Sequence, residues 1–291
     1  MTMEMPGDQP DPKRQDLRRL SEDNLLLRAS PGRYTFHDLI RAYAGVLAVD
    51  DEPVSGQRAA LTRLFDYYLA TATDAMDRLF PLETGFRPRI APPGVPVPDL
   101  DDAGTALAWL DSERPTLVAV AGHTVTGGWP THTFRLSAVL WRYLDGGHYT
   151  DALTLHGHAL RAAELAGEPA DQALALSCVG NTQARLGRAE TAVEVLRRAL
   201  DIYRRTGDLA TSANVLNNIG AAELRLGQYR SAAGHFTQAV ELYRQTGSAP
   251  RRPGQAGPLP GQPGRHRGDA GAGRRGPRAF RRGAGAVPAH R

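Results

Sequence analysis

The sequence contains very little cysteine and lysine, two residue types that often take part in disulfides, catalysis or phosphate binding. Its 291 residues include one cysteine, Cys178, which excludes an internal disulfide and is typical of a reducing compartment. They also include one lysine, Lys13, beside 34 arginines, and no glycine-rich loop precedes it. A phosphate-binding loop ends in Lys-Ser or Lys-Thr because the loop amides and the ammonium group together hold the phosphates. Such a loop is therefore excluded from this sequence.

Other common signatures are missing as well. No apolar run approaches the length of a membrane span, and the first residues do not resemble a secretory signal, so we expect a cytoplasmic protein. Neither His-Glu-x-x-His nor Gly-x-Ser-x-Gly occurs. His156 and His158 are two residues apart in a helical pattern and point to different faces, which argues against a metal site. We expect no catalytic residue, no metal and no enzyme activity.

The charge is concentrated at one end of the chain. Residues 249–291 contain ten arginines and one acid, a balance of +9, against +4 for the whole chain, so residues 1–248 carry −5. This tail is rich in Gly, Pro and Ala and has few large apolar residues, which predicts disorder. A basic tail could contact nucleic acid weakly. Alternatively, the same amino-acid composition arises when a GC-rich gene is translated out of frame. In that case the shifted reading frame should encode another repeat.

A repeat of forty residues organises the region before the tail. Gly147, Gly187 and Gly227 align, and so do Gly167, Gly207 and Gly247. Alanines also recur in all three copies, at Ala152/Ala192/Ala232 and Ala159/Ala199/Ala239. Apolar residues within each copy recur at three- and four-residue steps, which predicts two helices separated by a glycine. A single helical hairpin cannot bury its own apolar stripe, so the copies are expected to stack.

These positions resemble the tetratricopeptide repeat in a long, forty-residue form. The second copy carries Gly180, Leu186, Gly187, Ala192, Leu196, Ala199 and Leu200 where that motif has them. The third copy carries Gly220, Leu226, Gly227, Tyr229, Ala232, Phe236 and Ala239. The first copy, residues 134–167, departs from the pattern because Leu140-Trp141 stands where the others have Val-Gly and Ile-Gly. The resemblance implies an all-α stack of helical hairpins in a right-handed superhelix; an ordinary helical bundle is the alternative.

The resemblance also implies a binding surface. In tetratricopeptide stacks the first helix of each hairpin lines the concave face, which suits an extended peptide or a protein partner. Mapping the motif onto the second and third copies places six polar residues on that face. They are Ser177, Asn181, Arg185, Asn214, Asn217 and Arg225. Two alternatives remain open: these residues are ordinary solvated surface, or their partner lies within the same polypeptide.

The N-terminal region carries a second resemblance. Leu25–Ala29 and Arg33–Phe36 flank Ser30-Pro31-Gly32 and predict two short strands, followed by a helix from His37. The run from Gly32 to Ala44 resembles the end of the winged-helix subdomain of NB-ARC (STAND-class) switch ATPases, especially AfsR-like bacterial transcriptional regulators with C-terminal tetratricopeptide repeats.

That family closes its nucleotide module with Met-His-Asp, and here the residues are Phe36-His37-Asp38. The resemblance implies that His37 contacts the phosphate of bound ADP. Because the phosphate-binding loop is missing, ADP or ATP is expected only if another segment or chain supplies it. Taken alone, His37-Asp38 is also typical of a helix start. The chain thus resembles the C-terminal part of such a regulator.

Four regions follow from these observations. We expect a partial winged-helix end at 1–50, an amphipathic helix and Pro-rich linker at 51–98, tetratricopeptide-like repeats at 99–248, and the disordered tail at 249–291. Asp99, Asp101 and Asp102 precede a helical pattern and suit helix capping better than calcium binding.

The predicted function is a non-enzymatic protein-protein interaction module of a regulatory protein. The alternative is part of an ADP/ATP-dependent switch. A stack without a terminal cap exposes an apolar face, so a homodimer is also expected.

Overall fold

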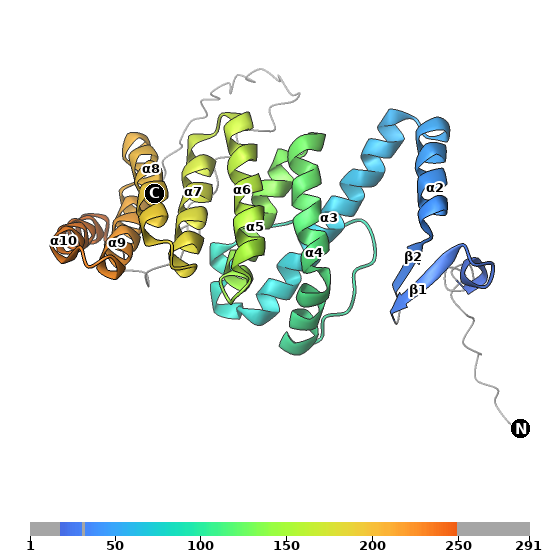
Figure 1. Ribbon diagram of the computed structural model, residues 1–291, viewed down its shortest axis with the longest axis horizontal. Helices are drawn as coiled ribbons and strands as arrows, with labels where there is room; N and C mark the ends of the chain where they lie inside the picture. Colours follow the sequence, from blue (N-terminus) through green and yellow to red (C-terminus); the bar gives the residue numbers. More distant parts are fainter. Residues whose placement is uncertain (1–17, 31–32, 249–291) are drawn as a thin grey trace, which may run out of the picture. The chain divides into compact units, whose positions relative to one another are not determined.

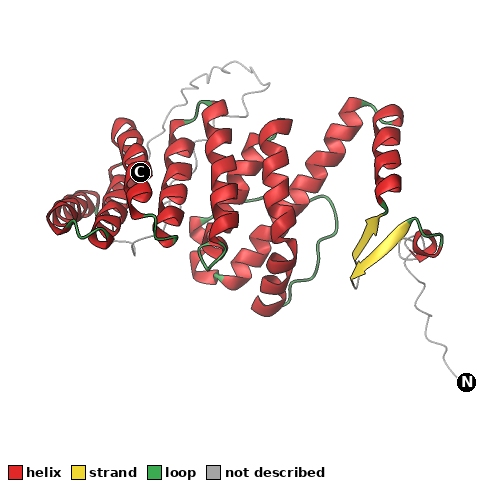
Figure 2. Cartoon of the chain, viewed as in Figure 1, coloured by secondary structure: helices red, strands yellow, loops and turns green. Residues whose placement is uncertain are grey.

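The computed structural model describes residues 18–30 and 33–248, a short β-hairpin followed by helices (Figures 1 and 2). The predicted tail, with its expected disorder and nucleic-acid contact, lies outside the described residues. The elements, in chain order, are β1 (Leu26–Ser30), β2 (Arg33–Phe36), α2 (Asp38–Asp51), α3 (Val54–Leu79), the 3-10 helix η1 (Pro81–Phe86), α4 (Ala103–Gly127), α5 (Pro130–Leu144), α6 (Tyr149–Ala166), α7 (Pro169–Arg185), α8 (Ala189–Thr206), α9 (Leu209–Arg225) and α10 (Tyr229–Thr246). Within these ranges no helix is long and apolar enough to cross a membrane.

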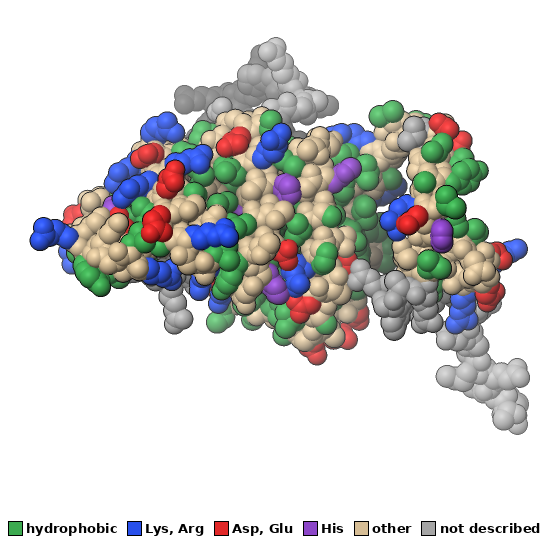
Figure 3. All heavy atoms as spheres, in the orientation of Figure 1, with side chains coloured by type: hydrophobic (Ala, Val, Ile, Leu, Met, Phe, Trp, Pro, Cys, Tyr) green, Lys and Arg blue, Asp and Glu red, His purple; other side chains and the backbone are tan. Residues whose placement is uncertain are grey.

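The two strands and the helix expected near the N-terminus are present. β1 and β2 pair antiparallel, with Leu27 opposite Thr35. Arg41 on α2 donates a hydrogen bond to the Thr35 hydroxyl (2.9 Å), which ties the helix to the hairpin. Apolar side chains of α2, including Leu39 and Tyr43, remain exposed, and Figure 3 shows hydrophobic side chains gathered over this helix.

Helices α3, α4 and α5 pack into one apolar core that continues into α6. Phe65 and Met76 of α3 are buried in the same cluster as Leu117 of α4 and Leu140 of α5. Trp129, between α4 and α5, donates from Nε1 to the Thr62 hydroxyl of α3 (2.9 Å). The helix at 54–79 therefore shares its core with the first repeat, while the proposed boundary at residue 98 stays a prediction.

Asp102 caps α4, as the sequence indicated. Its Oδ1 accepts a hydrogen bond from the Thr105 amide (2.7 Å), and the Thr105 hydroxyl accepts one from the Asp102 amide (3.1 Å). This reciprocal pair satisfies amides at the helix start that have no partner within the helix. The backbone contact also lowers the pKa of the Asp102 carboxyl below its ordinary value.

The three copies of the repeat form three helical hairpins, α5–α6, α7–α8 and α9–α10, and each helix contacts the next. Gly207 and Gly247 end α8 and α10 in the left-handed conformation, with φ of 76° and 63°. This region of φ favours glycine, so the recurrent glycines are explained by the helix ends. The predicted all-α, tetratricopeptide-like stack is confirmed.

Inside each of the later two hairpins the helices cross where one of them carries a glycine. A Cβ added to Gly180 of α7 would lie 2.7 Å from Cγ of Leu196 on α8. A Cβ added to Gly220 of α9 would lie 2.8 Å from Cε1 of Phe236 on α10. Both separations are far below van der Waals contact, so the two backbones can approach only because these positions lack a side chain.

The stack is tighter on one side than on the other. The backbones of the first helices of successive hairpins come close, α5 to α7 and α7 to α9, whereas in the described chain those of α6 and α8, and of α8 and α10, do not. A side-chain hydrogen bond from Arg204 of α8 to Gln238 of α10 (3.3 Å) bridges the latter pair. Between α6 and α8 runs an open groove of about 600 Å³. The surface formed by α5, α7 and α9 is therefore the concave one, and it is called the inner face below.

We predict that Gly180→Ala destabilises the protein by about 1–3 kcal/mol, since the added methyl overpacks the crossing with Leu196. The matched control is Gly157→Ala, in the middle of α6, where nothing lies within 4 Å of the added carbon. That control should stabilise the protein by about 0.5–1 kcal/mol, because alanine is the better helix former. Urea unfolding of both variants measures the difference, and equal effects would contradict the crossing argument.

Candidate partner-binding face

The six predicted ligand residues lie on the first helices of the second and third hairpins. Ser177, Asn181 and Arg185 follow one another at four-residue steps along α7, and Asn214, Asn217 and Arg225 occupy α9. Four-residue steps keep side chains on one helical face. The sequence mapping thus places these residues on the helices of the inner face, and their role in binding stays a prediction.

Two of the six are engaged inside the repeat. The Ser177 hydroxyl donates to the carbonyl of Ala173 (2.8 Å), and the side chain is buried. The Asn214 Oδ1 accepts a hydrogen bond from the Tyr243 hydroxyl of α10 (2.9 Å), and its Nδ2 donates to the Ala210 carbonyl (3.2 Å). These contacts hold α9 against α10, so a ligand would have to compete with them.

Arg185 and Arg225 occupy the same position in successive hairpins and make equivalent links. Arg185 Nη2 lies 2.8 Å from Oδ2 of Asp145, just after α5, and Arg225 Nη1 donates to the Ala184 carbonyl near the end of α7 (2.8 Å). Each arginine therefore reaches back to the C-terminal end of the preceding first helix. That end carries partial negative charge, which favours a cation.

The same edge of the inner face is basic. Burial raises the pKa of the Asp145 carboxyl above its ordinary value, while Arg185 and Arg142 act to lower it. Asp145 Oδ2 lies 2.8 Å from Arg185 and 4.0 Å from Arg142, and Glu83 Oε1 lies 3.4 Å from Arg142, so two acids face these two arginines. Arg225 adds a third guanidinium, and each guanidinium has five N–H donors, more than these contacts use.

Asn181 has a donor that the protein leaves unmatched. The residue is only 4% exposed, and its Nδ2 has no hydrogen-bond partner among the described residues. Buried amide groups nearly always have a partner, from protein, water or ligand. An acceptor that approaches α7 at this point would remove the cost of an unpaired donor.

The inner face also has an apolar part, which the sequence mapping missed. Phe134 and Trp141 of α5 and Leu174 of α7 line a shallow crevice between these helices, closed by Ser137, Ala138, Ala175 and Cys178. The repeat held the signal, because Phe134 and Trp141 lie forty residues before Leu174 and Asn181. The six predicted residues come only from the second and third copies, so α5, in the divergent first copy, contributes none of them. The inner face is therefore apolar at α5 and polar at α9.

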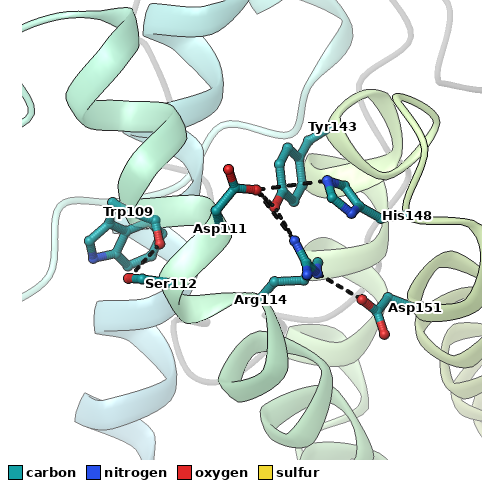
Figure 4. Close-up of polar contacts among 7 residues, drawn as sticks. All are labelled: Trp109, Asp111, Ser112, Arg114, Tyr143, His148 and Asp151. Atoms are coloured by element: carbon teal, nitrogen blue, oxygen red, sulfur yellow. Dashed lines mark hydrogen bonds and ion pairs between the residues drawn. The ribbon is translucent and has the colours of Figure 1, made fainter. Parts of the chain in front are cut away.

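A polar network secures α5, the first helix of this face, to α4 (Figure 4). The Tyr143 hydroxyl donates to Oδ1 of Asp111 (2.5 Å) and accepts from Nη1 of Arg114 (3.1 Å). Arg114 Nε also donates to Asp151 of α6 (2.8 Å), and the His148 ring packs against Tyr143. Burial, with the hydrogen bond to Asp111, raises the pKa of Tyr143 to about 12, so the phenol stays protonated and acts as a structural link.

The candidate reactive groups in the repeats are buried. Burial raises the pKa of the Cys178 thiol to about 12, so the thiol stays protonated and unreactive near neutral pH. His156 is enclosed between α5 and α6, with Nδ1 2.7 Å from the Ser137 hydroxyl, and burial lowers its pKa to about 4. In the described part of the chain no three His, Cys, Asp or Glu side chains gather as a metal site would require.

His37 lies at the start of α2, remote in sequence from the repeats. It occupies the N-cap position, its side chain is exposed, and it makes no capping hydrogen bond. Asp38 follows in the first turn, where its charge favours the helix dipole. This position fits a helix start, and the proposed contact of His37 with ADP stays a prediction.

Comparison with known proteins agrees with this architecture. Residues 171–245 match the tetratricopeptide repeat family. The chain is 30% identical over 200 residues, 65% of its length, to the Regulatory protein AfsR of Streptomyces griseus, and 37% identical over 113 residues to the protein of the same name from Streptomyces coelicolor. The matched regions are 19% and 11% of those two proteins, so the chain spans about a fifth of its relatives at most. The chain is thus homologous to AfsR regulatory proteins over 65% of its length and contains tetratricopeptide repeats.

We predict that His156 makes the protein less stable in acid. The ordinary pKa of 6.5 falls to about 4 in the folded state, so the unfolded chain binds the proton first as the pH drops. Stability is then complete above pH 6.5 and falls by about 3 kcal/mol as the pH approaches 4. Urea unfolding across this range should show that His156→Gln removes much of this slope, whereas His158→Gln, two residues along α6, keeps it. Equal slopes in all three proteins would contradict this account.

Proposed function

We propose that this chain is a non-enzymatic protein-protein interaction module of a regulatory protein, and that its inner face binds an extended segment of a partner. The coarse part of this proposal, a regulatory and interaction role, is supported by the tetratricopeptide match and by relatives named as regulatory proteins. The binding face and the chemistry of the partner are inferred from the side chains of α5, α7 and α9.

The observation that carries the proposal is the combination of contacts on neighbouring inner helices. The crevice itself, about 10 Å³, is too small to enclose a side chain, but the half-buried Phe134 and Leu174 at its rim give an apolar surface against which an apolar or aromatic side chain can pack. About two turns beyond Leu174 on α7, Nδ2 of Asn181 needs an acceptor, which a peptide carbonyl supplies. Both groups lie on the neighbouring helices α5 and α7, so one extended peptide can span them, although the buried Asn181 Nδ2 becomes reachable only after a small shift of the side chains around it.

Charge indicates which peptides fit. Arg142, Arg185 and Arg225 lie along the edge of the inner face, and the acids paired with them are Asp145 and Glu83, which leaves this edge with an excess of positive charge. An acidic segment gains favourable interactions with this edge, and a basic one is repelled. The partner is therefore expected to present an extended acidic segment with an aromatic or large apolar residue.

A phage-displayed library of random twelve-residue peptides tests this proposal. Selection on the full chain should enrich peptides that combine acidic residues with one aromatic residue. The selected peptides should lose at least tenfold in affinity for the combined Asn181→Ala, Asn217→Ala and Arg225→Ala variant. Removal of Arg225 also frees the Ala184 carbonyl, so a loss of about 1 kcal/mol in stability is expected and thermal unfolding must show that the variant is still folded.

The matched control is Arg198→Ala, which removes an arginine from the groove between α6 and α8 on the opposite side of the stack. This variant should bind the selected peptides as the unaltered protein does. Peptides that tolerate the inner-face variant but fail on the control would move the binding site to the outer groove. Selection without an acidic or aromatic bias would contradict the proposed partner chemistry.

A second function, part of an ADP/ATP-dependent switch, is supported by one observation. His37 stands exposed at the start of α2, directly after β2, where the resemblance to switch ATPases places a nucleotide contact. In this proposal another segment or chain supplies the phosphate-binding loop. Titration with fluorescent ADP provides a test, and the chain alone is expected not to bind. If the chain alone does bind and His37→Ala abolishes the binding, the switch function is favoured. The same result would contradict the need for a second polypeptide.

A further inference from the structure

The outward surface of α10 exposes residues whose counterparts in the preceding hairpin are buried. The forty-residue period makes Val240 the counterpart of Leu200 and Tyr229 the counterpart of Ala189. Val240 is 44% exposed and Tyr229 is 72% exposed, whereas Leu200 and Ala189 of α8 are 4% and 3% exposed. The two helices differ in what covers them, since α9 packs on α8.

Other positions of α10 keep their burial. Ala232, Ala239 and Tyr243 are as buried as their counterparts in α8, because they pack against α9 of their own hairpin. The positions that are exposed on α10 are thus the ones that, on α8, are covered by the following helix, α9. In the described chain, α10 presents a surface of the kind that elsewhere in the stack receives a packed helix.

These exposed positions form a single row, which we name the α10 stripe: Tyr229, Ala233, Phe236 and Val240. The spacing of four, three and four residues is that of the seam between two packed helices. At 1.5 Å per residue the stripe is about 17 Å long. Phe236 is half-buried because its inner edge fills the space beside Gly220, while the other three residues are exposed.

We propose that two copies of this chain associate through the α10 stripe, with the two α10 helices antiparallel. A twofold interface brings the same surface of each copy together, so the stripe must complement itself. Its residues alternate in size, as Tyr, Ala, Phe and Val. With the axis between residues 234 and 235, Tyr229 meets Val240 of the second copy and Phe236 meets Ala233, so that a large residue faces a smaller one in each layer.

Charge supports the same arrangement. Arg230 and Glu241 are exposed and lie along the same edge of the stripe. In the antiparallel arrangement Arg230 falls two residues, about 3 Å along the axis, from the position opposite Glu241 of the second copy. Both side chains span that offset, and the symmetry produces the ion pair twice. A parallel arrangement would put this edge of the two copies on opposite sides of the seam, so the ion pair would not form.

The size of the stripe determines how strong this association is. A standard interface buries about 800 Å² on each partner, and four side chains along about 17 Å of helix supply only part of that area. The dimer is therefore weak and depends on protein concentration. The proposal uses the outward surface of α10, so it holds whether or not the inner face binds a peptide.

Sedimentation equilibrium of the full chain over a hundredfold concentration range tests the proposal. The protein should follow a monomer–dimer equilibrium, and Tyr229→Glu should raise the dissociation constant at least tenfold. The matched control is Leu165→Glu on α6. Leu165 is also a large apolar residue with a similar exposure (68%), but it lies away from the stripe, so this variant should leave the equilibrium unchanged. Circular dichroism confirms that each variant is folded.

An exchange of charges tests the antiparallel arrangement. Arg230→Glu and Glu241→Arg should each raise the dissociation constant several-fold, because each places like charges together twice per dimer. The double variant should restore it to within about twofold of the original value.

A protein that stays monomeric throughout the concentration range would overturn the proposal, as it would mean that the stripe is free or is covered by the chain's own residues. A dimer indifferent to Tyr229→Glu would overturn it as well, since its interface would lie elsewhere. Assemblies that grow beyond the dimer would exclude the twofold arrangement.

Discussion

The close approach of two helices at a glycine is the constraint on which the rest of the stack depends. Gly180 and Gly220 leave room for Leu196 and Phe236, so the hairpins α7–α8 and α9–α10 close tightly enough to bury their alanines. A hairpin closed in this way still has an uncovered apolar side, which only the next hairpin buries. The part of the inner face formed by α7 and α9 and the exposed stripe at α10 follow from making this crossing twice, forty residues apart, while α5–α6 has Leu140 at the equivalent position.

Polar side chains then fix how one hairpin sits on the next. Arg185 and Arg225 repeat the same link between first helices on the inner face. Glu223 of α9 links helices away from the inner face. It is fully buried, with Arg197 of α8 3.1 Å from its Oε1 and His235 of α10 2.7 Å from its Oε2. A buried carboxylate without partners would be strongly destabilising, so this contact favours one arrangement of the three helices over alternatives.

The fold could be predicted in most respects, because periodicity and glycine positions report directly on helices, their ends and their stacking. The Asp102 cap was also predicted correctly from the local pattern. The candidate site could be predicted only in part. A motif indicates which helical face a residue occupies, but the partner of each side chain depends on the neighbouring helix, as the contact of Asn214 with Tyr243 shows. The apolar crevice was not predicted, because Trp141 lies at the position where the first copy departs from the motif.

Two surfaces of the repeats are thus built for contact, and they differ in kind. The inner face combines a small apolar crevice, an unpaired amide and arginines, which suits a flexible segment that can adapt to scattered groups. The α10 stripe is a continuous row on one helix, which suits another preformed helix. Since the two surfaces belong to different helices, one event need not exclude the other. A dimer would carry two inner faces, and a partner with two acidic segments would then bind with a higher effective concentration for its second segment, provided that its linker spans them.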